Sequence, residues 1–449
     1  MAGSHHRTES AMRSTQALLL LTLGTGVIRA QDAADFWPQF RGPLGTGEAP
    51  KADPPIEWSE DKNVRWKIEL PGRGHATPVL WGDRLFVATA IPIGPKFAGK
   101  PDTDPGAHDN LRVTQKHRFT VMAIARKDGS VLWQENVAEI VPHEGGHNTG
   151  SLASGSPVCD DTHVFAYFGS HGLFCLTHDG EIVWQIDLGD MHSKHNHGEG
   201  ASPALHGDTL VVNWDHEGES FVVAFDKATG RERWRRPRQE VTSWSTPLVI
   251  EHKGQAQVIV AGTNRIRAYN LENGSVIWNC GGLSNNVCAT PIYSDGIILA
   301  GSSYDTRNFM AIRVDGAKGD ITGTDKVLWS TSQGPPYVPS PLAYDGAVYF
   351  LRHYQGVIRR MQIDNGANVP GAFRLPSIRD VYSSPVAAAK RVYVTDLQGT
   401  TMVMDSTAKP KLLARNRLED SFSATAVVAG EELYLRGKRF LYCIAKPAE

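Results

Sequence analysis

Cysteine and net charge are both scarce in this chain. Its 449 residues include five cysteines, and none of them belongs to a CxxC or CxxCH pattern. This scarcity argues against a disulfide framework, a zinc ribbon and a covalent haem. Cys280 and Cys288 are close enough in sequence to form a disulfide, and two buried thiols are the alternative. The formal net charge is −2, so no field of one sign predicts binding to nucleic acid or to anionic lipid.

Long hydrophobic runs are also missing beyond the first 30 residues, so no later segment is expected to cross a membrane. The N-terminus has the pattern of a cleavable secretory signal. Arg13 follows a plausible start at Met12, an apolar run covers 17–23, and the small residue Ala30 suits a cleavage point. An uncleaved anchor is the alternative, but the run is short for that role. No cysteine stands at the cleavage point, so no lipid anchor is predicted, and we expect a periplasmic or secreted protein.

Turn-forming residues are plentiful, and a repeated pattern accompanies them. Tryptophans recur at roughly 45 to 50 residues, a spacing typical of propeller blades. These tryptophans are Trp133, Trp184, Trp234, Trp278 and Trp329. A step of a small residue before proline follows most of them, and it starts earlier with "HATP" and ends later as "SATA". The residues of this step are Thr77, Ser156, Ser202, Thr246, Thr290, Ser340, Ser384 and Thr425, which gives eight units.

Each unit has the same order of strands and turns. An apolar run such as "PVLWGDRLFVAT" is divided by a Gly-Asp or Asp-Gly pair, which suits a tight hairpin. A third strand, a second turn of the type "DG", "TG" or "NG", and the tryptophan strand come next. Four antiparallel strands form one blade, so we predict an all-β, eight-bladed β-propeller. The proline suits the first residue of the innermost strand, because it has no N–H to donate.

The two ends of the repeat predict how the ring closes. The last unit, from "SATA" onward, has only three strands, and the sixth and seventh units lack the tryptophan. The missing strand is found near the start as "NVRWKIEL", around Trp66. We expect this N-terminal strand to complete the last blade, because an open ring would expose strand edges. The expected organisation is an extension and signal peptide over 1–30, an arm over 31–63 and a single propeller over 64–449.

The repeat, "SP…DG.VY…G…AlD..TG..lW" in outline, resembles the PQQ-like (quinoprotein-type) propeller family over about residues 64–446. That family includes quinoprotein alcohol dehydrogenases and the propeller lipoprotein of outer-membrane assembly. The opening "WPQFRGPLGTG" is similar to exported propellers of planctomycete-type bacteria. The chain has neither the adjacent Cys-Cys pair nor the matching calcium ligands of the dehydrogenases, so bound PQQ is not expected. The lipidated cysteine of the assembly protein is absent too.

Histidines and carboxylates are expected to gather on one face of the propeller. The loops that lead into the inner strands and those that join the second and third strands share that face, so their side chains converge at the channel mouth. The sequence predicts a divalent-metal or acid–base site there, with His75, His147, His197 and Asp215 as ligands and with His147, His197 and Asp215 as catalytic candidates. The alternative is a rim of solvated or hydrogen-bonded histidines. Other polar residues of these loops are Asn148, His171, Glu199, His216, Asn264, Asn286, Asp305, His353, Asp396 and Asp420.

Aromatic and cationic residues of the same loops are candidates for contact with a ligand or cofactor. The cofactor-binding candidates are Trp244, Tyr304, Arg307, Tyr354 and Arg436, and the aromatic residues for stacking on a sugar or planar cofactor also include Tyr337 and Tyr382. Ordinary rim residues are the alternative.

Two insertions, 91–117 and 138–150, lengthen loops on the predicted mouth and suggest a lid. "HEGGH", at 143–147, imitates a metalloprotease motif, but a proline and two glycines argue against the helix which that motif needs. A local cluster, "MHSKHNHGEG" at 191–200, is either a solvated loop or a ligand contact through His197.

The sequence thus predicts an exported propeller that binds or scaffolds a small molecule, a glycan or a protein through its channel face. The alternative function is an enzyme on the same face, either a metal- or histidine-dependent glycan-active or redox protein or a PQQ-dependent dehydrogenase. The absence of a Ser-His-Asp spacing, a phosphate loop and a cofactor fingerprint favours binding.

Overall fold

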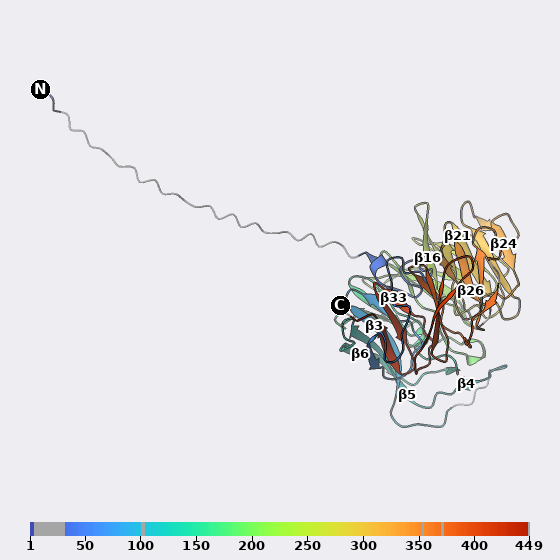
Figure 1. The fold of residues 1–449 in the computed structure, drawn as a ribbon, viewed down its shortest axis with the longest axis horizontal. Helices are drawn as coiled ribbons and strands as arrows, with labels where there is room; N and C mark the ends of the chain where they lie inside the picture. The colour runs from blue at the N-terminus through green and yellow to red at the C-terminus, as the bar shows by residue number, and fades with distance from the viewer. Residues whose placement is uncertain (4–31, 100–103, 353, 370–371, 448–449) are drawn as a thin grey trace. The chain divides into compact units, whose positions relative to one another are not determined.

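The chain folds into a ring of eight antiparallel blades (Figure 1). The structure is a computed structural model that describes residues 1–3, 32–99, 104–352, 354–369 and 372–447. The predicted signal peptide and His353 therefore lie outside the described residues. All eight blades belong to the unit Asp32–Glu449. The predicted eight-bladed all-β fold is confirmed.

The first four blades follow one another along the chain. Blade one contains β2 (Val79–Trp81), β3 (Arg84–Ile93), β5 (Lys116–Ala125) and β6 (Val131–Ile140). Blade two contains β8 (Val158–Cys159), β9 (His163–Tyr167), β10 (Leu173–Thr177) and β11 (Ile182–Ile186). Blade three contains β12 (Ala204–His206), β13 (Thr209–Trp214), β14 (Phe221–Asp226) and β15 (Glu232–Pro237). Blade four contains β16 (Leu248–His252), β17 (Gln255–Ala261), β18 (Ile266–Asn270) and β19 (Val276–Cys280), with β23 (Gly319–Asp320) added in parallel to β19.

The remaining blades repeat this order. Blade five contains β20 (Ile292–Ser294), β21 (Ile297–Ser302), β22 (Asn308–Arg313) and β24 (Val327–Thr331). Blade six contains β25 (Leu342–Tyr344), β26 (Ala347–Leu351), β27 (Val357–Gln362) and β28 (Phe373–Arg374). Blade seven contains β29 (Val386–Ala388), β30 (Arg391–Thr395), β31 (Thr400–Asp405) and β32 (Leu412–Arg417). Blade eight contains β33 (Val427–Ala429), β34 (Glu432–Arg436), β35 (Phe440–Ile444) and the N-terminal β1 (Val64–Glu69).

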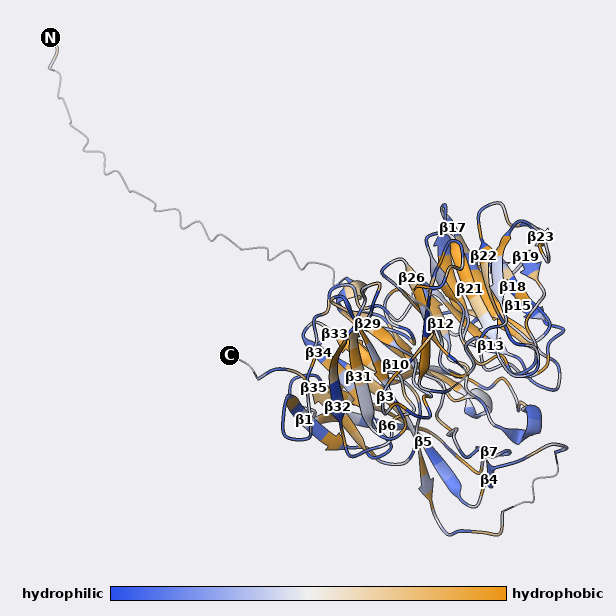
Figure 2. Cartoon of the chain, turned by 45° about the vertical axis from the view of Figure 1, so that its right-hand side comes forward, coloured by the Kyte–Doolittle hydropathy of each residue, from blue (hydrophilic) through white to orange (hydrophobic). Residues whose placement is uncertain are grey.

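The predicted closure of the ring is confirmed in blade eight. Strand β1 pairs antiparallel with β35, and Trp66 lies opposite Cys443 (Figure 2). The first strand of the propeller therefore fills the edge that the last repeat leaves open. Strands of the blades are largely hydrophobic in Figure 2 and the connecting loops largely polar, as expected for blades that pack face to face. No helix in the described part of the chain is long and apolar enough to span a membrane.

Tryptophans of five blades join their blade to the next, whereas Trp278 donates to Gln257 of its own blade at 3.3 Å. The indole of Trp184 donates to the carbonyl of Lys227 at 2.9 Å, and its ring lies over Gly230, whose φ is +69°. A Cβ at Gly230 would come within 2.8 Å of the ring, so the turn needs glycine both for its φ and for this contact. The same indole-to-carbonyl bond recurs at Trp66, Trp133, Trp234 and Trp329. These contacts explain the spacing of tryptophan and glycine in the sequence.

The small residues before proline form a closed ring of hydrogen bonds around the channel. In each blade the backbone N–H of this residue donates to the hydroxyl of its counterpart in the next blade, over 2.9 to 3.2 Å. The last of these bonds runs from the N–H of Thr425 to the hydroxyl of Thr77 and closes the circle. A hydroxyl is therefore needed at every step, which explains why serine or threonine occupies all eight positions.

The segment before β1 crosses the opposite end of the channel. Trp37 exchanges backbone hydrogen bonds with Leu80 of blade one. Further along, the Arg41 guanidinium is buried and donates to the carbonyls of Pro341 and Pro385 from blades six and seven. Burial without an acidic partner lowers the pKa of Arg41 to about 9. This crossing places Phe40 across the channel axis.

Candidate functional site

A cavity of about 390 Å³ lies on the axis of the propeller. Its volume falls within the range of small-molecule sites. All eight hydroxyl residues of the hydrogen-bonded ring line it, and Phe40 lines it from below. The cavity is thus closed at one end by the N-terminal segment and faces the loops of the predicted mouth at the other.

The hydroxyl ring gives the cavity a polar floor. Each hydroxyl oxygen accepts the N–H of the neighbouring blade, and its own O–H proton can still be donated to a ligand above. This arrangement suits a ligand with many acceptor oxygens. The floor residues are Thr77, Ser156, Ser202, Thr246, Thr290, Ser340, Ser384 and Thr425.

A second layer lies above the floor and differs from blade to blade. It consists of the residues two positions before each floor residue, and all eight of them line the cavity. In blade order these are His75, Ser154, Gly200, Trp244, Cys288, Val338, Tyr382 and Ser423. The repeat therefore supplies a constant floor, while the walls are specific to this chain.

One wall is aromatic and comes mainly from blades five to seven. The ring centres of Tyr304 and Tyr337 are 6.1 Å apart, and those of Tyr354 and Tyr382 are 5.7 Å apart with nearly parallel planes. Tyr337 and Tyr354 connect the two pairs at 6.2 Å. Burial raises the pKa of Tyr337 well above its usual value, so its phenol stays protonated and can donate. All five aromatic residues that the sequence predicted for stacking, with Trp244 as the fifth, line the cavity.

The opposite wall is rich in histidine and comes from the loops of blades one to three. His75, His108, His147 and His197 all line the cavity. Burial, reinforced by the charges of Arg73 and Arg436, lowers the pKa of His75 to about 3, so this imidazole is neutral at physiological pH. The ring centres of His108, His147 and His197 lie 4.8 to 5.8 Å from one another.

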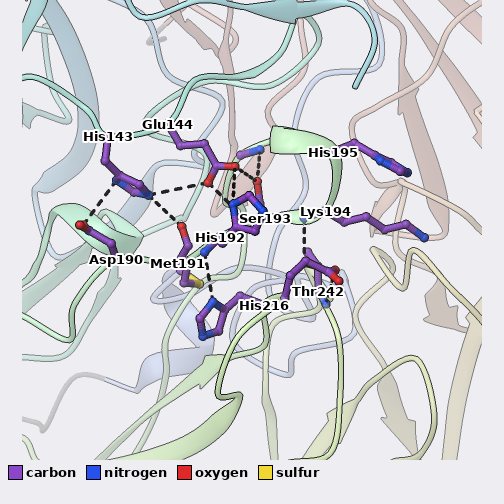
Figure 3. A network of polar contacts seen from close by, with 12 residues as sticks. His143, Glu144, Asp190, Met191, His192, Ser193, Lys194, His195, His216 and Thr242 are labelled. Carbon is purple, nitrogen blue, oxygen red and sulfur yellow. Dashed lines mark hydrogen bonds and ion pairs between the residues drawn. The ribbon is translucent and has the colours of Figure 1, made fainter. Parts of the chain in front are cut away.

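A network of polar contacts holds the histidine loops in place (Figure 3). Glu144 accepts from the backbone N–H and the hydroxyl of Ser193, at 3.2 and 3.1 Å. The backbone N–H of Lys194 donates to Thr242 at 2.9 Å. The indole of Trp244 donates to the carbonyl of Gly198 at 2.7 Å, so the same residue lines the cavity and fixes this loop.

Glu199 is the one carboxylate among the described residues that line the cavity. Both backbone N–H and hydroxyl of Ser170 donate to it. Burial raises its pKa to about 7 despite these bonds, so the group titrates near neutral pH. It is therefore able to accept or donate a proton at the cavity wall.

Three predicted site residues lie outside the cavity lining. Asp215 forms a fully buried, two-pronged ion pair with Arg238, at 2.7 and 3.0 Å, and is not grouped with the histidines. Arg307 is exposed on the surface. Arg436 is buried beside the segment that leads to the floor and donates to the carbonyl of Ala76 at 2.9 Å. The structure thus brings together His75, His147 and His197 but not Asp215.

Sequence reasoning missed several lining residues. His108 lies within the inserted segment 91–117, where a lone histidine gives no periodic signal. Phe40 lies in the N-terminal segment, whose path across the channel no local pattern indicates. Cys288 lines the cavity as a free thiol, and burial raises its pKa to about 12. It forms no disulfide with Cys280.

The comparisons with known proteins concern both family and fold. A family model described as outer membrane protein assembly factor BamB matches residues 117–369 and 218–446. A comparison with curated proteins finds no match.

Solved structures similar to this chain include BamB and two dehydrogenases. BamB from Moraxella catarrhalis is 14% identical, with 81% of this chain and 99% of that chain covered and a TM-score of 0.53. A europium-containing methanol dehydrogenase is 11% identical over 90% of this chain and 89% of its own, with a TM-score of 0.60. A quinohemoprotein alcohol dehydrogenase from Pseudomonas putida is 11% identical over 93% and 82%, with a TM-score of 0.55. At these identities the likeness is one of fold.

Proposed function

The chain belongs to the PQQ-like β-propeller family whose model is described as outer membrane protein assembly factor BamB, and from this premise we propose that it is an exported sugar-binding protein. Because one propeller fold serves many functions, the proposal rests on the cavity and not on the family. The observation that carries it is the pairing of a tyrosine wall with a histidine wall above a floor of eight hydroxyls.

The chemistry of the lining favours a neutral, oxygen-rich ligand. Aromatic faces pack against the C–H face of a sugar ring, while imidazoles, amides and hydroxyls bind its hydroxyl groups. No lysine or arginine occurs among the described residues of the lining. Lys194 is close by, with its ammonium 6.0 Å from the centre of the Tyr304 ring. An uncharged mono- or disaccharide therefore fits the cavity better than an anionic one.

Pyrroloquinoline quinone, which the fold family suggests, does not fit this lining. The cofactor carries three carboxylates, and the described wall offers no guanidinium or ammonium group to pair with them. It offers instead the carboxyl group of Glu199 and the single thiol of Cys288. We derive no reaction that uses this cofactor.

The proposal is tested by titrating neutral sugars into the protein without its predicted signal, residues 31–449. Glucose, maltose, cellobiose and xylobiose are the probes, with glucuronic acid and pyrroloquinoline quinone as charged comparisons, and calorimetry gives Kd. We expect at least one neutral sugar to bind. Replacing Tyr382 with alanine is expected to weaken the binding of that sugar by about 0.5–1.5 kcal/mol, or roughly 2- to 12-fold in Kd.

Tyr293→Ala is the matched control, because Tyr293 packs against His252 away from the cavity. Equal affinities of the Tyr382 and Tyr293 variants would place the sugar elsewhere. Binding of the charged probes alone would overturn the proposal. Export is tested separately with the full chain, signal included, because cleavage after Ala30 leaves Gln31 as the first residue detected by N-terminal sequencing of the secreted protein.

A further inference from the structure

The mouth of the cavity is covered on one side by three loops that are joined to one another. We call residues 104–115, 141–150 and 187–199 the histidine lid. Its first two parts pair as a small sheet, in which β4 (Asn110–Leu111) lies antiparallel to β7 (Gly146–His147) (Figure 2). This pairing joins the two inserted loops, although β5 and β6 lie between them in the chain.

The third loop of the lid is attached to the other two by hydrogen bonds. The side-chain amide of Asn110 donates to the carbonyl of His195 at 2.7 Å. The N–H of His147 donates to the carbonyl of His197 at 3.0 Å. The N–H of Asn148 donates to the carbonyl of Asp109 at 2.9 Å. Residues from all three loops therefore meet at one place beside the cavity.

Two imidazoles and a carboxylate converge at this meeting point. One ligand atom from each of His108, Asp109 and His147 lies within 4.8 Å of the other two. The His197 ring is close to both imidazoles, with its centre 4.8 Å from that of His108 and 5.0 Å from that of His147. Asp109 has a positive φ of 56°, a left-handed conformation that aspartate adopts more readily than most residues.

Hydrogen bonds fix the positions of both imidazoles. Nδ1 of His108 lies 2.9 Å from the carbonyl of Gly106, and since a carbonyl only accepts, Nδ1 carries the proton and Nε2 keeps its lone pair. Nδ1 of His147 lies 2.7 Å from the hydroxyl of Thr149 and accepts the backbone N–H of the same residue at 3.3 Å, so these contacts hold the ring in place without assigning its proton. Metal-binding histidines are commonly oriented by such a bond from the second ring nitrogen.

We propose that His108, Asp109 and His147 bind one divalent transition-metal ion, which fastens the histidine lid at the edge of the cavity. Two nitrogens and one carboxylate oxygen suit Zn²⁺ and related ions, whereas Ca²⁺ and Mg²⁺ prefer oxygen ligands. Because His108 and His147 also line the cavity, an ion held by them would lie at its edge with a coordination position left for a further ligand. That position would be taken by water or by a sugar hydroxyl; this last link rests on the proposed function, while the metal site itself does not.

The site is tested by calorimetric titration of Zn²⁺ into chelator-treated protein, residues 31–449. We expect one ion per chain. His108→Ala and His147→Ala are expected to weaken Kd by at least roughly 10- to 100-fold, the loss seen even for groups outside the ligand sphere. His206→Ala, at the β12–β13 turn, is the matched control and should leave Kd unchanged. Unchanged affinity in both lid variants, or no binding of Zn²⁺, Co²⁺ or Ni²⁺ to the parent protein, overturns the proposal.

Protease protection provides a second measurement that separates the metal site from the sugar site. With Zn²⁺, cleavage in the segment 104–115 is expected to slow in the parent and the His206 variant but not in the His108 variant. His108 is exposed, so its substitution should leave the fold intact. Failure of sugar binding with this protection intact refutes only the proposed function. Protection that is equal in all three proteins refutes the metal site.

Discussion

The two sides of the cavity are built on the same repeat and differ in almost everything above the floor. Blades one to three contribute histidines on long loops that are joined by β4 and β7. Blades five to seven contribute four tyrosines whose rings pack side by side. The hydroxyl floor is the same on both sides. The comparison teaches that this chain specialises through its loops and keeps the blade framework unchanged.

The outermost strands of the blades also differ between the histidine side and the tyrosine side. On the histidine side, Trp133, Trp184 and Trp234 each bond to the next blade. On the tyrosine side, blades six and seven have no such tryptophan, and β28 has only two residues. Trp329 of blade five bonds to Ile363 of blade six in the same way, so the two sides differ in this contact only at blades six and seven.

The largest effect that this comparison predicts is on stability. Trp234→Ala removes a buried indole and its bond to Leu271, and should lower the free energy of unfolding by about 3–5 kcal/mol. Phe373→Ala in β28 removes a half-buried ring and should cost clearly less. Urea denaturation of both variants measures the difference. Equal losses would show that the two sides are joined equally well.

The next effect belongs to the histidine side alone and depends on pH. Glu199 faces His143 and Glu144, and its pKa is raised from 4.5 to about 7 by burial. Between these values the folded state keeps the proton that the unfolded state has lost, so the free energy of unfolding falls as pH rises. Glu199→Gln should remove this fall, and its advantage over the parent should grow from pH 4.5 to 7 and then stay constant.

Chemical denaturation across that range measures the advantage, with the exposed Glu181→Gln as the control. A difference between Glu199→Gln and the parent that does not change with pH would show that the carboxyl is not buried in solution.

The smallest effect tests whether the floor is really common to both sides. Thr77→Val on the histidine side and Thr290→Val on the tyrosine side each leave one buried N–H without its acceptor, and both bonds are 3.2 Å long. Each should lower the free energy of unfolding by about 1–3 kcal/mol, and by the same amount. Thermal unfolding of the pair decides this, with Ser423→Ala as a control that lies outside the ring of bonds. Unequal losses would mean that the floor supports one side more than the other.

Much of the fold was predictable from short-range patterns. The small residue before proline, the Gly-Asp turns and the tryptophan spacing indicated eight blades, and the lone strand around Trp66 indicated the closure. The aromatic set at the mouth was also predictable, since each residue occupies a fixed place in its repeat. Asp215 has an equivalent place in its repeat, but it pairs with Arg238. This pair was not predictable, because no sequence pattern shows which nearby cation will neutralise a buried carboxylate.

The sequence by itself determined the blades, their order and their closure, because hydrogen-bond ladders and turns depend on residues close together in each repeat. Only the tertiary structure decided that His108 joins His147 and His197, that Phe40 closes the channel, and that the histidine and tyrosine walls face each other. These contacts depend on where long loops and the N-terminal segment pass once the ring has formed. No periodicity in the sequence encodes the path of these segments. The architecture therefore follows from the repeated residues, and the site follows from the loops and the N-terminal segment that do not repeat.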